Sequence, residues 1–217
     1  MRVVWPLPPD SKANRVDAKF LDPSYPAFRK KMGLSPDEHP GVDINLTGTS
    51  GDQDLRYPIV AILPMRIIHA RNHRVWGNVV LGEVPAHICS KLGYPYLAVQ
   101  YAHMRDVLVK EGDFLYPGDL VGTIGKGDPA FPFLAHLHME IRTRPLPPDH
   151  WPRTRENILN SYIDPVEFLS KHESYVRRYY FPMGIALEDP STDIVVLNMN
   201  DPAKVYLRLP AYNGRRR

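Results

Sequence analysis

The sequence predicts a mainly β protein: an antiparallel sheet with short C-terminal helices and a small tail. From residue 57 to residue 142, short β-branched and aromatic runs are broken by Gly, Pro and Asn, a spacing that favours hairpins over β–α–β units. The chain has 217 residues, of which 23 are proline, while 43% are hydrophobic and 24% charged. Because these two fractions are those of a folded globular chain, the many prolines favour strands and irregular loops over long helices.

The expected strands share β-branched residues bounded by turn residues. Within the main sheet they are residues 59–63, 66–69, 77–81, 97–101, 120–124 and 137–141. Residues 1–38 are expected to be irregular, and residues 85–96 to hold a helical turn inserted between two strands.

The C-terminal part is expected to contain two short helices and two strands. One helix covers residues 155–162, and the other starts at Asp164-Pro165, since Asp is a preferred N-cap and Pro suits the first helical position. The tail strands cover 193–197 and 204–209.

Several functional classes are disfavoured by the composition. No apolar run approaches the about 18–20 residues that cross a bilayer, and early prolines leave no continuous apolar region for a signal peptide. The single Cys89 excludes an internal disulfide framework and a multi-cysteine zinc site, and a lone thiol is more often buried than nucleophilic. The net charge of +3 does not indicate nucleic-acid binding, and residues 215–217, three arginines, are expected to be a solvated tail.

Four histidines fall in patterns that indicate chemistry. His39 precedes Asp43 by four positions, His103 follows Tyr101-Ala102 near the end of a strand, and His136-Leu137-His138 begins another strand. Residues two apart on a strand share a face, so His136 and His138 lie side by side.

Together these residues offer two histidines and one carboxylate as metal ligands, with two further histidines nearby. Imidazole and carboxylate suit Zn²⁺, and three protein ligands leave a position open, as in catalytic zinc sites. Each pair alone occurs by chance, and only their combination indicates a metal. The other five histidines show no pattern and receive no role: His69, His73, His87, His150 and His172.

The order and spacing of these motifs resemble the lysostaphin-type (LytM-type) zinc metallopeptidases, from about residue 5 to residue 141. The residues that carry the resemblance are His39-Pro40-Gly41-Val42-Asp43-Ile44, Tyr101-Ala102-His103-Met104, the glycines Gly118, Gly122 and Gly125, and Ala135-His136-Leu137-His138-Met139-Glu140-Ile141. Tyr162-Ile163-Asp164-Pro165 resembles the segment that often closes such domains.

The resemblance implies a fold, a site and a substrate. The implied fold is a compact antiparallel β-sheet with a substrate groove. By it, Zn²⁺ is bound by His39, Asp43 and His138, and the catalytic residues are His103 and His136. One of these two would act as general base and a protonated histidine would stabilise the oxyanion, in an order that the sequence leaves open. The implied substrate is a peptide bond of bacterial peptidoglycan, in a stem crosslink or a bridge, which places the protein in the periplasm, cell wall or exterior, after removal of an export segment or as a phage-encoded protein.

Four departures from the family pattern affect the predicted groove walls. Leu63-Pro64-Met65 replaces a tight Asp-Gly turn, no Phe-Gly-x-Arg stretch precedes the first motif, and residues 85–96 and the tail after Lys171 have no counterpart. The predicted domain organisation is a zinc metallopeptidase domain over residues 1–145, with residues 146–217 as an extension packed on it.

Two other functions stay open from the sequence. A non-haem Fe(II) oxygenase uses two histidines and one carboxylate, but it would leave the extra histidines without a task. A silent peptidoglycan-binding or regulatory module of the same fold would need its metal position blocked, for which Asn14 and Asn45 are conceivable side chains.

Overall fold

The protein is represented by a computed structural model that describes residues 3–8, 10–130, 133–173, 194–198 and 201–209. Contacts divide the chain into two units, Met1–Val176 and Arg177–Arg217. Among the described residues, no helix has the length and apolar character needed to span a membrane.

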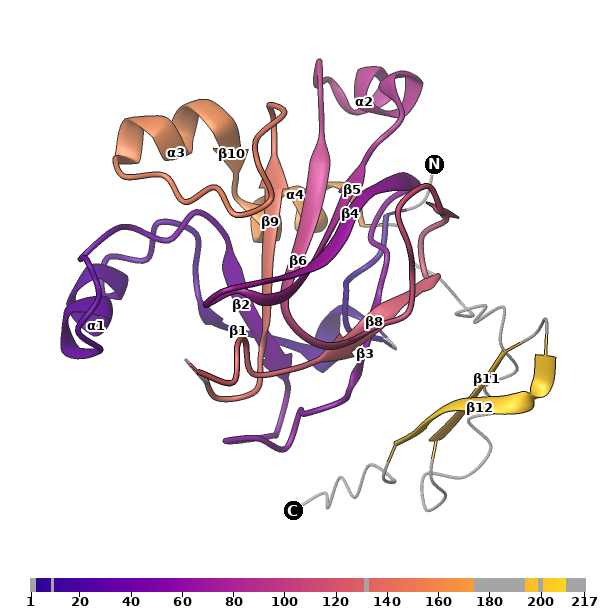
Figure 1. The fold of residues 1–217 in the computed structure, drawn as a ribbon. Helices are drawn as coiled ribbons and strands as arrows, with labels where there is room; N and C mark the ends of the chain where they lie inside the picture. Colours follow the sequence, from indigo (N-terminus) through magenta and orange to yellow (C-terminus); the bar gives the residue numbers. More distant parts are fainter. Residues whose placement is uncertain (1–2, 9, 131–132, 174–193, 199–200, 210–217) are drawn as a thin grey trace. The chain divides into compact units, whose positions relative to one another are not determined.

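The first unit is a mainly antiparallel β structure with short helices, as the sequence predicts (Figure 1). Its strands are β1 (Asn14–Ala18), β2 (Val42–Leu46), β3 (Pro58–Val60), β4 (Met65–His73), β5 (Gly77–Glu83), β6 (Ala98–Val107), β7 (Phe114–Leu115), β8 (Leu120–Ile124), β9 (Leu137–Arg142) and β10 (Tyr162–Ile163). Its helices are the 3₁₀ turn Ser11–Ala13, α1 (Tyr25–Lys31), α2 (Ala86–Leu92), α3 (Arg155–Ser161) and α4 (Pro165–His172).

Strands β9 and β6 form the middle of the sheet. The main strand order is β1-β2-β9-β6-β5-β4-β7, while β10 pairs with β9, and β8 pairs with both β6 and β3. All these pairings are antiparallel. The strands that carry the histidine motifs therefore lie next to one another, although they are far apart in the sequence.

One face of the sheet packs into the core. Register aligns Val42, Met139, Tyr101 and Val80 across β2, β9, β6 and β5, and all four side chains are buried. The Tyr101 hydroxyl accepts a hydrogen bond from the backbone N–H of Ile62 at 2.9 Å, which satisfies both groups inside the core. Because side chains alternate along a strand, the neighbouring residues Asp43 and His138 point to the opposite face.

The segment after β9 returns to the sheet. In β10, Tyr162 pairs with Arg142 of β9, and α4 buries Phe168 and Leu169 in the core. The side chain of Asp164 accepts hydrogen bonds from the first-turn N–H groups of α4, and Pro165 begins the helix, which confirms the predicted start. Helix α2 confirms the predicted helical turn and lies at one end of β5 and β6 (Figure 1).

The second unit contains an antiparallel pair, β11 (Ile194–Asn198) and β12 (Asp201–Leu209), close to the two predicted tail strands. Residue 193, the first residue of the predicted strand 193–197, lies outside the described residues. That residues 146–217 as a whole pack on the catalytic domain stays a prediction.

Some boundaries differ from the expectation. Residues 1–38 are not wholly irregular, since β1 pairs with β2, and α1 and the 3₁₀ turn also lie there. The strand expected over 59–63 ends at Val60, while β4 continues four residues beyond its expected end at residue 69. The greater length of β4 follows from its pairing, since it stays paired with β5 as far as His73 opposite Gly77.

Candidate metal centre

Three possible metal ligands meet on the face of the sheet opposite the core residues Val42 and Met139. Asp43 of β2 is the direct cross-strand partner of His138 in β9, so both side chains share a face. His39 lies on the segment that enters β2. Its Nε2 atom is 3.1 Å from His138 Nδ1 and 3.3 Å from Asp43 Oδ1, and His138 Nδ1 is 2.9 Å from that same oxygen.

These distances suit ligands of one metal ion. Zinc bonds of about 2.0–2.2 Å to imidazole and carboxylate place tetrahedral ligand atoms about 3.3–3.6 Å apart, so outward shifts of a few tenths of an ångström from the observed 2.9–3.3 Å are enough to admit an ion. The three ligand atoms lie within 4.8 Å of one another, and both histidines are buried. His39, Asp43 and His138 therefore fit a zinc ion with one coordination position left open.

Hydrogen bonds on the outer side of each imidazole select the nitrogen that faces the centre. His39 Nδ1 donates to the carbonyl oxygen of Lys19 at 2.9 Å, which leaves the Nε2 lone pair pointing inward. His138 Nε2 lies 3.2 Å from Glu140 Oε1, so Nδ1 is the nitrogen left for a metal. Such outer partners fix the tautomer and the orientation of histidine ligands in metal proteins.

The charges at the centre favour a cation. Burial alone would raise the pKa of Asp43, but His39, His136 and His138 together hold this pKa well below its usual range. Burial lowers the pKa of His138, yet Asp43 and Glu140 together raise it to about 9. In the metal-free chain a proton therefore occupies His138 at neutral pH, and a metal ion must displace it.

His136 lies beside the three possible ligands. It forms a β-bridge with Gly125 immediately before β9, and its Nε2 is 3.7 Å from Asp43 Oδ1. Its Nδ1 donates to the carbonyl oxygen of Leu134 at 2.7 Å. The ring thus presents Nε2 toward the centre.

An unusual backbone conformation brings His103 to the same place. Its neighbour Ala102 pairs with His138, so regular alternation would point His103 to the opposite face. Instead φ of His103 is +60°, a left-handed value that costs a non-glycine residue about 1–2 kcal/mol. The ring centroid then lies 4.8 Å from that of His136 and 5.7 Å from that of His138.

The carbonyl oxygen of Trp76 fixes the orientation of His103. It accepts both the backbone N–H and the Nδ1–H of His103, each at 3.0 Å, which leaves Nε2 as the free acceptor. Burial, with the neighbouring His136 and His138, holds the pKa of His103 well below its usual range. A neutral imidazole with a free Nε2 is the form that accepts a proton.

Comparison with known proteins gives the family. A model of peptidase family M23 matches residues 37–150, which is more than half of the chain. The chain belongs to peptidase family M23. A comparison with curated proteins found no significant match.

Several solved structures are similar to this chain. A SpoIIIAH–SpoIIQ complex matches at 19% identity with a TM-score of 0.51, over 77% of this chain and 99% of that chain. The catalytic domain of lysostaphin from Staphylococcus simulans matches at 20% identity with a TM-score of 0.45, over 61% and 80% of the two chains. A zinc-containing peptidase from Vibrio cholerae matches at 19% identity with a TM-score of 0.47, over 71% and 41%.

Next to His138, Glu140 and Arg142 form a buried ion pair, and neither residue was among the site residues expected from the sequence. Glu140 Oε2 accepts from Arg142 Nε at 2.9 Å, and both side chains are fully buried. Arg142 also donates to Gln100 and to backbone carbonyls of residues 146–148. The signal was present, because Glu140 and Arg142 continue the alternation of His136 and His138 along one face of β9.

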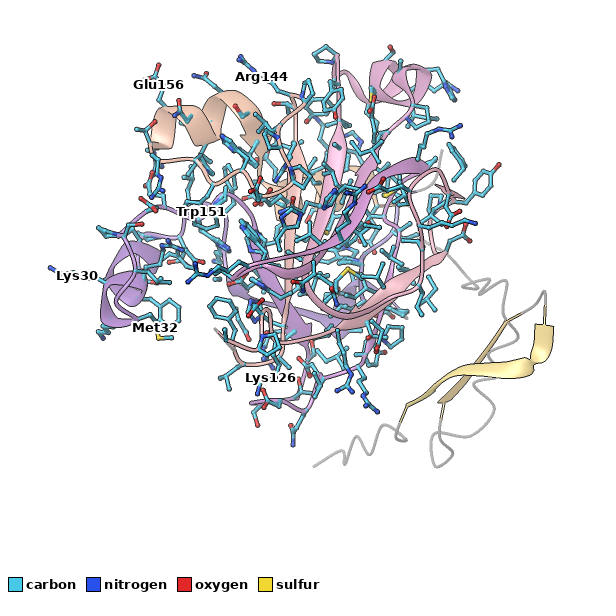
Figure 2. All side chains as sticks on the ribbon, viewed as in Figure 1. Lys30, Met32, Lys126, Arg144, Trp151 and Glu156 are labelled. Atoms are coloured by element: carbon cyan, nitrogen blue, oxygen red, sulfur yellow. The ribbon has the colours of Figure 1, made fainter. Side chains whose placement is uncertain are left out.

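Two tryptophans lie next to the three possible metal ligands. The Trp76 ring lies 5.3 Å edge-on from His138 and 5.5 Å from Trp151. Arg29 of α1 lies with its guanidinium carbon 4.6 Å from the centroid of the Trp151 ring; Figure 2 labels Trp151. Trp151 also donates to Asp37 Oδ2 at 3.1 Å. The segment before His39 and the segment after β9 are therefore joined beside the centre, by residues that show no sequence motif.

The remaining residues singled out in the sequence lie elsewhere. Cys89 is buried in the core cluster, as expected, and burial raises the pKa of its thiol. Asn14 hydrogen-bonds to the backbone of Leu7 and Asp10, and Asn45 hydrogen-bonds to Asp54 and to the Ala135 carbonyl. Both amides are thus engaged with groups outside the set of three possible ligands.

Proposed function

We propose that this chain is a zinc-dependent endopeptidase that hydrolyses a peptide bond of bacterial peptidoglycan. The observation that supports it most is that His39, Asp43 and His138 bring three possible ligand atoms together. An acceptor behind each of the two imidazoles orients it, and two further imidazoles lie beside them. Membership of peptidase family M23 agrees with hydrolysis of a peptide bond. Action on peptidoglycan would place the chain in the periplasm, the cell wall or outside the cell.

In this proposal His39, Asp43 and His138 hold the zinc ion. Zinc bound by such a set supplies a Lewis acid and makes water a nucleophile near neutral pH. Glu140 and the Lys19 carbonyl keep the two histidines oriented from behind. The site would therefore be ordered before the substrate arrives.

His103 and His136 are the proposed catalytic residues. Each ring donates its Nδ1–H to a backbone carbonyl and presents Nε2 to the centre. One Nε2 would take the proton of the attacking water as general base, and a protonated ring would donate a hydrogen bond to the tetrahedral oxyanion or a proton to the leaving amine. A backbone carbonyl anchors both rings in the same way, so in this proposal either ring can be the general base.

We also propose that residues 1–145 form the catalytic domain and that the following residues are an extension. The five proposed site residues all lie before residue 145. Contacts of Trp151 with Trp76 and Asp37 would let the extension shape one side of the substrate site.

Digestion of defined peptidoglycans tests the proposal. The zinc-loaded full chain is incubated with peptidoglycan of several crosslink types, and the released fragments are identified by mass spectrometry. New amino and carboxyl termini at one bond type, absent with His103→Ala and present with the surface variant His87→Ala, are expected. Stoichiometric zinc without cleavage of any type would instead favour a binding or regulatory module and contradict the proposed activity.

A further inference from the structure

Two histidines to which the sequence analysis gave no role meet on β4. His69 and His73 share a strand face, and their Nε2 atoms lie 2.6 Å apart. Four residues of strand separate their backbones by roughly 13 Å at about 3.3 Å per residue. Both side chains must therefore extend along the strand toward each other.

From this geometry we propose that His69 and His73 form a second metal site, which binds a divalent transition-metal ion such as Zn²⁺ or Cu²⁺ through both imidazoles. The 2.6 Å separation is shorter than the usual range for a hydrogen bond from a nitrogen donor, about 2.7–3.2 Å. Two imidazole nitrogens bound at about 2.0–2.1 Å to one ion lie about 2.8–3.4 Å apart, for right-angled to tetrahedral geometry. A small outward movement of either ring admits the ion.

The neighbouring charges allow a cation there. Glu111 lies 3.8 Å from His69 Nδ1 and accepts two hydrogen bonds from Arg71 at 3.0 and 3.2 Å. The carboxylate thus offsets the guanidinium that lies between the two histidines on the strand. It also favours a proton on His69 Nδ1, which leaves Nε2 as the lone-pair donor.

The second site lies on the same face as the first but is separate from it. Register aligns His69 with Leu81, Gln100 and Glu140 across β4, β5, β6 and β9. Three strand spacings of about 4.8 Å place it roughly 14 Å from β9. Metals that act on one substrate atom together are about 3.5–4 Å apart. The proposed ion is therefore independent of the centre at His138 and is not its catalytic partner.

Calorimetric titration of the metal-free full chain with Zn²⁺ tests the second site. We expect two binding steps for the wild type and for His87→Gln, a matched substitution of an exposed histidine on α2. His73→Gln is expected to lose the weaker step and to keep the tighter one. His138→Ala is expected to keep the weaker step and to lose the tighter one. If His138→Ala does not fold, Asp43→Asn replaces it.

A spectroscopic readout identifies the ligands. In His138→Ala loaded with one equivalent of Cu²⁺, electron paramagnetic resonance should show coupling to two imidazole nitrogens, and the added change His73→Gln should remove it. A single Zn²⁺ step in the wild type that His138→Ala removes, or two unchanged steps in His73→Gln, would overturn the second site. Failure of the proposed peptidase centre would appear instead as a single wild-type step that His138→Ala keeps and His73→Gln removes.

Discussion

His138 lies between two carboxylates, with Nδ1 2.9 Å from Asp43 Oδ1 and Nε2 3.2 Å from Glu140 Oε1. The register sets this arrangement, since Asp43 is directly opposite His138 and Glu140 follows two residues later on the same face. Arg142 Nε holds the outer carboxylate at 2.9 Å. A buried series of charges thus orients the histidine that is proposed as a zinc ligand.

The outer carboxylate is expected to support both metal binding and folding. Glu140→Gln should weaken zinc binding roughly 10–100-fold, the usual effect of losing an outer partner of a ligand. It should also lower the free energy of unfolding, toward the lower end of about 3–5 kcal/mol, since the buried Arg142 loses its carboxylate but keeps its other acceptors. Zinc titration and urea unfolding measure the two effects. Glu156→Gln, at an exposed position on α3, should change neither (Figure 2).

His103 is expected to act in catalysis without binding the metal. His103→Ala should reduce kcat by about 10²-fold or more, the scale of a lost general base. Its zinc content should stay at the wild-type level, whereas His138→Ala should lose both zinc and activity. Full turnover by His103→Ala would show that the assignment of this residue is wrong.

Zinc affinity is expected to rise with pH. The metal-free pKa of His138 is about 9, so zinc must displace a proton below that pH. Apparent affinity should therefore rise about tenfold per pH unit until the pH approaches this pKa. Competition titrations at several pH values between 6.5 and 9 measure the slope, and a flat profile would contradict the proton on His138.

The stability of the metal-free chain should show the opposite trend. Folding raises the pKa of His138 from about 6.5 to about 9, so folding favours its protonated form. This stabilisation is fully present below about pH 6.5 and is lost as the pH rises through about 9. Thermal unfolding of the chelator-treated chain should show a lower Tm at pH 9.5 than at pH 7, by more than in His138→Gln.

The turn that carries Trp76 is expected to be strained. Val75 has φ of +72°, which a β-branched residue rarely adopts. Val75→Gly should keep or increase stability, because relief of about 1–2 kcal/mol of strain exceeds the gain in unfolded-chain entropy of about 0.4–1 kcal/mol. Val75→Ala keeps a Cβ atom and is the matched control. A clear loss of Tm specific to the glycine variant would contradict the strain.

The alternation of residues along a strand is what made much of the site predictable. His136 and His138 share a face because they are two residues apart. Helices α3 and α4 each begin directly after an N-cap residue whose side chain accepts a hydrogen bond from the first turn. The same rule reaches Glu140 and Arg142, but it does not predict that Arg142 donates to the backbone carbonyls of residues 146–148. These hydrogen bonds depend on the irregular path of the chain after β9.

Other features depend on irregular backbone that no periodic pattern shows. His103 reaches the site face only through its left-handed φ, and the carbonyl that orients it comes from the β4–β5 turn. A register shift between Ile67 and His69 sets the face on which His69 lies. Such local departures arise from tertiary pairing, and so the contact between His69 and His73 was not visible in the sequence.

Restoration of activity by zinc tests the central claim most directly. The chain is treated with a chelator, dialysed, and given one equivalent of Zn²⁺, and cleavage of peptidoglycan crosslinks is followed by mass spectrometry. We predict no cleavage by the metal-free chain, full cleavage after zinc is added, and none at any zinc level in His138→Ala. Cleavage at the wild-type rate by the metal-free chain would contradict the account.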